Sequence, residues 1–219
     1  MKVHQLPPKL DILFRVIGSE VPSDHGYALY SALSRILETE EDQWIHGNPH
    51  IGLHTVRGTP LGNGRRLIGP NARLGLRLPA DLLPRSLKLA GKALELDGCK
   101  LRIGVSETRA LVPAATLYCR IATTKNGDDD ARFDAEIGRQ LVSLGIRGKV
   151  FRVPVNPRES GGRDPSRRIV RVKNKRIVGY SVLATELTGE ESILLQERGL
   201  GGRRRMGCGV FVPREGTST

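Results

Sequence analysis

Residues 11–37, DILFRVIGSEVPSDHGYALYSALSRIL, contain a predicted strand followed by a predicted amphipathic helix, and the fold class follows from this pair. The segment 11–17 predicts a strand that ends at Gly18. A helix is predicted over 23–37, because apolar side chains recur there at helical spacing on one stripe: Leu29, Leu33, Ile36 and Leu37. Ser23 or Asp24 is the expected N-cap of this helix. A strand followed by an amphipathic helix is the start of an α+β domain.

The rest of the first half continues this alternation. Strands are predicted near 50–56 and 72–79, on either side of the Gly/Arg-rich stretch 61–71. A short helix is predicted over 84–90, after Pro84 and before Gly91. A hairpin follows, with strands over 92–96 and 100–104 and a turn at Asp97-Gly98. The element order is therefore strand, helix, strand, strand, helix, strand.

The second half repeats the same order. The expected elements, in chain order, are a strand over 117–123, a helix from 128–130 to 144, a strand over 149–153, a hairpin of strands 169–172 and 177–184, a helix over 188–198 and a strand over 206–212. Thr188 and Glu191 form a capping box at the start of the second helix. The architecture predicted is α+β, with two tandem βαββαβ domains over 1–108 and 109–219 and a boundary near 105–112.

The composition narrows the class of partner. Among 219 residues, 35 Lys and Arg stand against 23 Asp and Glu, for a formal charge of +12. This balance indicates a nucleic acid partner and does not support an acidic pocket of the glycosidase kind. Aromatic residues make up only 4% of the chain, so binding of single strands by base stacking is disfavoured and contact with the phosphates of a folded RNA is favoured.

The sequence gives little support for a membrane protein, a disulfide-stabilised protein or a cofactor-dependent protein. The longest apolar runs are shorter than a membrane span, and the N-terminal residues have no apolar signal core, so a cytoplasmic location without membrane partners is expected. The sequence has three cysteines, which lie far apart: Cys99, Cys119 and Cys208. Their odd number and wide spacing argue against a disulfide framework or a zinc site. No cofactor is expected.

Two patterns in the sequence have the residue types of a metal site. His46, His50 and His54 would align on a helix, but Gly47, Pro49 and Gly52 make a helix there improbable. An acidic cluster lies at a helix start, where carboxylates complement the helix dipole, and consists of Asp128, Asp129, Asp130 and Asp134. We therefore predict no metal site.

The most specific motif is the glycine-rich loop 199–209, GLGGRRRMGCG, placed between a predicted helix and the last strand. Its glycines can adopt a positive φ and let the backbone approach another chain closely; they are Gly199, Gly201, Gly202, Gly207 and Gly209. The loop also carries Arg203, Arg204 and Arg205, whose guanidinium groups can bind phosphates bidentately.

This loop resembles the glycine-rich loop of the RAMP superfamily of CRISPR-associated proteins. The run 179–213 and the segment DHGYALYSALSRIL at 24–37 are similar to the Cas-six type of repeat-RNA endoribonuclease, especially its Myxan subtype. The resemblance implies two ferredoxin-like (RRM-like) domains. It also implies metal-independent cleavage of precursor CRISPR RNA within each repeat, by attack of the 2′-OH, leaving a 2′,3′-cyclic phosphate and a 5′-OH.

The implied reaction needs groups that transfer protons near neutral pH, which histidine does best. His25 is the first candidate, because it lies at the first turn of the predicted helix, where backbone N–H groups favour a phosphate. Its alternative is a structural histidine at the edge of the core. His46 is the second candidate. Tyr27 and Tyr30 lie on the same helix and are candidates for orienting the phosphate or the nucleophile.

A basic segment, 147–176, is the predicted RNA-binding arm, with eleven Lys and Arg against two acidic residues. The residues expected to contact RNA in its hairpin are Arg167, Arg168, Arg171, Lys173, Lys175 and Arg176. The partners implied are the precursor CRISPR RNA repeat as a stem-loop, the mature crRNA that the protein retains, and subunits of a Cascade-type complex. The alternative function is a non-catalytic RAMP-type RNA-binding subunit of such a complex.

Overall fold

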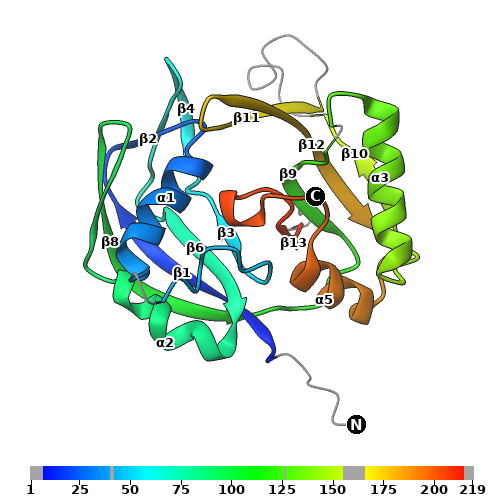
Figure 1. The fold of residues 1–219 in the computed structure, drawn as a ribbon, viewed down its shortest axis with the longest axis horizontal. Coiled ribbons are helices and arrows are strands. Elements are labelled where there is room, and N and C mark those ends of the chain that lie inside the picture. The colour runs from blue at the N-terminus through cyan, green and yellow to red at the C-terminus, as the bar shows by residue number, and fades with distance from the viewer. Residues whose placement is uncertain (1–6, 40–41, 126, 155–165, 215–219) are drawn as a thin grey trace. The chain divides into compact units, whose positions relative to one another are not determined.

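The computed structural model describes residues 7–39, 42–125, 127–154 and 166–214. The chain divides into two compact units, unit 1 (Met1–Ala110) and unit 2 (Leu111–Thr219). Figure 1 shows unit 1 from blue to green and unit 2 from green to red. Each unit has its own main sheet and its own helices.

Unit 1 is built on a five-stranded antiparallel sheet in the order β3-β6-β1-β8-β7. Its strands are β1 (Lys9–Ile17), β3 (Gly52–His54), β6 (Arg73–Pro79), β7 (Ala93–Leu96) and β8 (Cys99–Ala110). The helical elements are α1 (Gly26–Leu37), η1 (Ala80–Leu82), α2 (Leu83–Ser86) and η2 (Leu87–Leu89). Three short strands form a second sheet in the order β2-β5-β4: β2 (Glu20–Pro22), β4 (Thr59–Gly62) and β5 (Arg65–Leu67).

The alternation of side chains along β1 explains the core of unit 1. Ile12 and Phe14 are fully buried and pair directly with Leu76 and Leu74 of β6. The intervening residues of β1, including Asp11, point to the opposite face of the sheet, since the side-chain period of a strand is two. On α1 the stripe predicted from the sequence is largely inside, with Leu29, Leu33 and Leu37 buried and Ile36 partly buried.

Unit 2 contains an antiparallel sheet in the order β10-β12-β9-β13, with β11 paired to β12. Its strands are β9 (Leu117–Ala122), β10 (Lys149–Arg152), β11 (Arg167–Val172), β12 (Lys175–Thr185) and β13 (Phe211–Pro213). Its helical elements are α3 (Asp130–Ser143), α5 (Gly189–Arg198) and η3 (Arg204–Met206).

The helices of unit 2 pack against one core. Phe133 and Ile137 of α3 and Leu195 of α5 join Tyr180 and Phe211 from the sheet in a buried cluster. Asp129 caps α3 by accepting from the amide of Arg132, and the predicted capping box of Thr188 and Glu191 is present at α5. These local signals explain where both helices begin.

The two main sheets share one strand arrangement. Read in chain order as strands one to four, β1, β3, β6 and β8 lie in the same spatial order as β9, β10, β12 and β13, namely four, one, three, two. This is the ferredoxin-like arrangement, so the α+β prediction with two βαββαβ domains is confirmed. The structure places the division between the units after Ala110.

Some boundaries differ from the sequence predictions. Helix α1 begins at Gly26 with His25 as N-cap, and no side chain caps it, so the expected capping by Ser23 or Asp24 was wrong. The last strand begins at Phe211 rather than at residue 206, because Arg203 and Gly207 adopt left-handed conformations that close the short helix η3. Within the described ranges, no helix is both long and apolar enough to cross a membrane. The part of the basic segment over 155–165 lies outside the described residues.

Candidate active site

His25, the first catalytic candidate, lies inside unit 1. The residue is only 3% exposed, its Nδ1 lies 2.5 Å from the carbonyl oxygen of Pro22, and its Nε2 accepts from the amide of Val56 at 3.1 Å. The carbonyl can only accept and the amide can only donate, so the ring is neutral with its proton on Nδ1. Protonation would break the bond from Val56. The geometry therefore argues against the proton-transfer role predicted for His25 and makes it a structural histidine.

His46, the second candidate, is exposed and lies against α1. The hydroxyl of Tyr30 lies 3.0 Å from Nδ1 of His46, and the two rings stack with centroids 6.3 Å apart. Tyr30 itself is 8% exposed, so it is a fixed support for the imidazole. In the described part of the chain no bond is formed by Nε2 of His46, which leaves this nitrogen for a ligand.

Hydrogen bonds and buried side chains hold the loop after α1 in a conformation that places His46 next to Tyr30. The indole Nε1 of Trp44 donates to the carbonyl of Leu37 at 3.1 Å, and Trp44 and Ile45 are both buried. The amide of His46 donates to Oε1 of Glu38 at 2.5 Å and to the carbonyl of Gln43 at 3.1 Å. Sequence reasoning missed Glu38, whose signal is a carboxylate at a helix C-terminus, where the dipole disfavours it.

Tyr27 lies one turn before Tyr30 on α1 and is half-buried. Its hydroxyl makes no bond to the described residues. Residues three apart on a helix are neighbours on its surface, so Tyr27 lies on the same face as the Tyr30–His46 pair. The structure thus brings three of the four predicted catalytic residues to one face, and places the fourth, His25, in the core.

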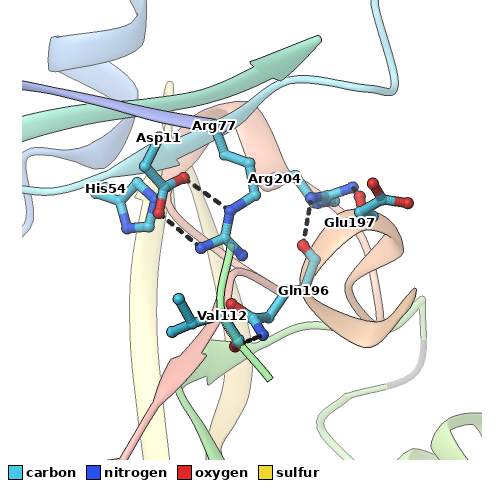
Figure 2. Close-up of polar contacts among 7 residues, drawn as sticks. All are labelled: Asp11, His54, Arg77, Val112, Gln196, Glu197 and Arg204. Atoms are coloured by element: carbon cyan, nitrogen blue, oxygen red, sulfur yellow. Dashed lines mark hydrogen bonds and ion pairs between the residues drawn. The ribbon is translucent and has the colours of Figure 1, made fainter. Parts of the chain in front are cut away.

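His50 and His54, the two remaining histidines that the structure describes, do not join a metal site. Among the described residues, no group of three His, Cys, Asp or Glu side chains has the geometry to hold a metal ion. His54 lies on β3 and its Nε2 is 3.1 Å from Oδ1 of Asp11 (Figure 2). The amide of His50 donates to Oδ1 of Asn48 in the loop before β3.

Asp11 forms a second polar cluster that sequence reasoning missed. Nε and Nη2 of Arg77 donate to its two oxygens, each at 2.8 Å (Figure 2). Burial alone would raise the pKa of Asp11, but the bonds from Arg77 and His54 outweigh it and hold the pKa well below its usual range. The alternation along 11–17 was the available signal, because it places Asp11 opposite the buried Ile12 and Phe14.

The glycine-rich loop folds back onto β9 of its own unit. A Cβ on Gly201 would lie 2.4 Å from the carbonyl oxygen of Thr123, and one on Gly209 would lie 2.3 Å from that of Leu200. The amide of Gly202 donates to Thr123 at 2.8 Å. Positive φ angles occur at Gly199, Gly201, Gly207 and Gly209. The predicted close approach is therefore made to the protein's own backbone.

The three arginines of this loop differ. Nη1 of Arg204 donates to the carbonyls of Glu197 and Arg198, both at 2.7 Å, which caps the C-terminus of α5. Figure 2 shows Arg204 beside Glu197. This capping explains Arg204 structurally and argues against the phosphate-binding role predicted for it. Arg203 lies 3.5 Å from Oγ1 of Thr123 through Nη1, and Arg203 and Arg205 are both half-buried.

The hairpin of β11 and β12 carries exposed positive charge at its tip. Four side chains there are exposed: Arg171, Lys173, Lys175 and Arg176. Arg171 lies directly opposite Arg176 in the strand pairing, and like charges so placed repel each other. Lys173 has a φ of 54°, a left-handed conformation that glycine or asparagine adopts more easily. This surface is unfavourable for the isolated chain and suited to an anion.

The base of the hairpin is more internally bonded than its tip. Nε of Arg168 donates to Oγ of Ser181 at 2.9 Å, and Nη2 of Arg167 lies 3.5 Å from the carbonyl of Asp128. Both arginines are half-buried. Of the six hairpin residues predicted to contact RNA, the four at the tip are therefore the better placed.

Comparisons with known proteins complete the description. The family model "Cas6 Crispr" matches residues 10–216. The chain is 37% identical over 205 residues to the CRISPR-associated endonuclease Cas6 of Myxococcus xanthus (strain DK1622), covering 93% of this chain and 81% of that protein.

Solved structures share the fold at low identity. A CRISPR-associated protein Cas6 is 10% identical with a TM-score of 0.66, covering 94% of this chain and 100% of that one. A RAMP protein described as binding different RNA substrates is 13% identical with a TM-score of 0.65, with the same coverage of both chains. With the family model matching nearly the whole sequence, the chain belongs to the Cas6 family of CRISPR-associated proteins.

Proposed function

We propose that this chain is an endoribonuclease that cleaves precursor CRISPR RNA within its repeats, with His46 and Tyr30 at the centre of the chemistry. The observation that carries the proposal is the 3.0 Å contact between the Tyr30 hydroxyl and Nδ1 of the exposed His46. Membership of the Cas6 family, whose Myxococcus xanthus relative is named an endonuclease, supports the same reaction class.

The reaction is an attack of the 2′-OH on the adjacent phosphate. The 2′-oxygen forms a bond to phosphorus, the bond from phosphorus to the 5′-oxygen breaks, and the products carry a 2′,3′-cyclic phosphate and a 5′-OH. The proton released by the 2′-OH passes to Nε2 of His46, and Nε2–H then donates that proton to the leaving 5′-oxygen, so that His46 returns to its neutral form. No metal ion takes part in this scheme.

Tyr30 allows His46 to do this because a hydroxyl both donates and accepts. When the hydroxyl accepts from Nδ1–H, Nε2 has a lone pair and is a base. When His46 is protonated, Tyr30 still accepts from Nδ1–H while Nε2–H is an acid. The stacked, buried tyrosine thus keeps the ring in one orientation through both states.

RNA is bound mainly through its phosphates in this proposal. The four exposed cations at the tip of the β11–β12 hairpin contact the stem of the repeat, and Arg203 and Arg205 are further phosphate contacts. Strong phosphate binding also accounts for retention of the processed crRNA and for delivery of the protein with its RNA to a Cascade-type complex.

The test is a cleavage assay on the repeat RNA in excess EDTA, with wild type and His46→Ala. We expect wild type to cut, to leave a 2′,3′-cyclic phosphate, and to spare an RNA with 2′-deoxyribose at the break point. His46→Ala should bind the RNA without cutting it. Binding without cleavage by wild type would instead support the non-catalytic RNA-binding subunit, and a requirement for a divalent ion would overturn the mechanism.

A further inference from the structure

We infer that Glu38 is a positioning residue that holds the backbone of His46 so that its imidazole stays on Tyr30. This inference rests on the proposed function and adds a residue that touches neither the RNA nor the reacting atoms. Oε1 of Glu38 accepts from the amide of His46 at 2.5 Å across eight residues of sequence.

The carboxylate of Glu38 makes a single hydrogen bond within the described residues. Within the part of the chain that the structure describes, its side chain bonds only to the amide of His46, whereas its backbone amide closes α1 by donating to the carbonyl of Ser34 at 2.9 Å. The cap backbone is extended, with φ −103° and ψ 143°, which turns the chain away from the helix axis. The side chain therefore spans the start and the end of the loop that presents His46.

Stability of the helix does not explain a glutamate at this position. The C-terminus of a helix carries partial negative charge, so a carboxylate there is disfavoured and a neutral side chain would suit α1 better. The last turn of α1 contains Arg35, as the dipole favours, and Glu38 follows it with the opposite charge. The bond to His46 is the interaction that offsets this cost.

The other anchors of the loop do not replace Glu38. Trp44 and Ile45 are buried and fix the backbone just before His46. Asp42 is tied to Nη1 of Arg85 at 2.8 and 2.9 Å, but both side chains are about half exposed. Among the described residues, only Glu38 and the carbonyl of Gln43 accept from the amide of His46 itself. Loss of the carboxylate should leave the loop attached but let the His46 backbone rotate.

The experiment measures single-turnover cleavage of repeat RNA by the full chain. Glu38→Ala should slow cleavage by about 10- to 100-fold, because a displacement of about 1 Å at a catalytic group costs up to 10²-fold in rate. Glu38→Gln should cleave within about threefold of wild type, since its amide oxygen still accepts from the His46 amide. Binding of an uncleavable 2′-deoxy repeat should be unchanged or tighter in both variants, and neither melting temperature should fall.

Asp42→Ala is the matched control, because it loosens the same loop without touching His46, and it should cleave at the wild-type rate. Wild-type cleavage by Glu38→Ala, or a Glu38→Gln variant as slow as Glu38→Ala, would overturn the positioning role. If wild type itself does not cut the RNA, the proposed function has failed. If wild type cuts, His46→Ala does not and Glu38→Ala does, the function stands and this inference alone is wrong.

Discussion

The hydroxyl of Tyr30 lies 3.0 Å from Nδ1 of His46, although Tyr30 is on α1 and His46 is in the loop that follows it. This relationship leaves Nε2 of His46 at the surface while the other ring nitrogen is supported by a buried side chain. His25, the N-cap residue of α1, has the opposite environment, with both ring nitrogens bonded inside the unit. The two histidines are therefore expected to respond differently to substitution.

His25→Ala should lose stability rather than chemistry. It leaves the carbonyl of Pro22 and the amide of Val56 without their partner, which costs about 1–3 kcal/mol of unfolding free energy. His46→Ala should keep the stability of wild type and lose about 10²–10⁴-fold in cleavage rate. Urea denaturation and single-turnover cleavage of both variants check this, and a stable but inactive His25→Ala would reverse the assignment.

Tyr30→Phe should slow cleavage while keeping the fold. The phenyl ring still fills the buried space, but Nδ1 of His46 loses its partner, which corresponds to about 10- to 150-fold in rate for a bond to a charged group. Tyr27→Phe is the control, because the Tyr27 hydroxyl has no bond to the described residues, and it should cleave within about twofold of wild type. Equal rates for both variants would remove Tyr30 from the site.

Arg176→Ala should weaken RNA binding without weakening the fold. Arg176 faces Arg171 across the hairpin, so its removal relieves repulsion and leaves the unfolding free energy unchanged or slightly higher. Binding measured from low to high salt should show a slope of log affinity against log salt that is smaller by about one. An unchanged slope would place the RNA away from the hairpin tip.

Arg204→Ala should act on stability instead. Its guanidinium donates to two carbonyls at the end of α5, so its loss should cost about 1.5–3 kcal/mol of unfolding free energy. The salt dependence of RNA binding by the variant that remains folded should match that of wild type. If stability is kept and the salt slope falls, Arg204 binds phosphate as its sequence context first indicated.

Asp11→Asn should destabilise unit 1 in a pH-dependent way. Removing the carboxylate charge breaks the ion pair between Asp11 and the buried Arg77, at a cost of about 3 kcal/mol near neutral pH. The folded-state pKa of Asp11 lies below its usual value, so its contribution is complete above about pH 4 and is lost as the pH falls below that.

Denaturation of wild type and Asp11→Asn between about pH 2.5 and 6 checks this prediction, since the difference between them should shrink toward the acid end. Asp42→Asn is the control, because the Asp42–Arg85 pair is about half exposed and should contribute less than about 0.5 kcal/mol. If the difference in unfolding free energy between wild type and Asp11→Asn stays constant with pH, ionisation of Asp11 does not contribute to the acid sensitivity of the protein.

The architecture could be predicted because its signals are local. The apolar stripe of α1, the turn at Asp97-Gly98 and the capping box at Thr188 each lie within a few residues, and each led to an element that the structure contains. The last strand was predicted to begin at residue 206, but it begins later because Arg203 and Gly207 adopt left-handed conformations. The left-handed conformation of Arg203 could not be predicted, since a non-glycine residue in that conformation has no clear sequence signal.

The site could be predicted only as a set of candidates. The order of strands and helices, the basic character of the hairpin and the helix that carries the tyrosines follow from the amino-acid sequence, because periodicity and charge are properties of neighbouring residues. Which histidine has an available ring nitrogen follows only from the folded arrangement of distant residues. The amide that donates to Nε2 of His25 belongs to Val56, which is 31 residues away in sequence. The hydroxyl that contacts Nδ1 of His46 belongs to Tyr30, which is 16 residues before it. Packing brings such distant partners together. A buried imidazole with both nitrogens bonded has a structural role, whereas an exposed imidazole with one available nitrogen can transfer a proton.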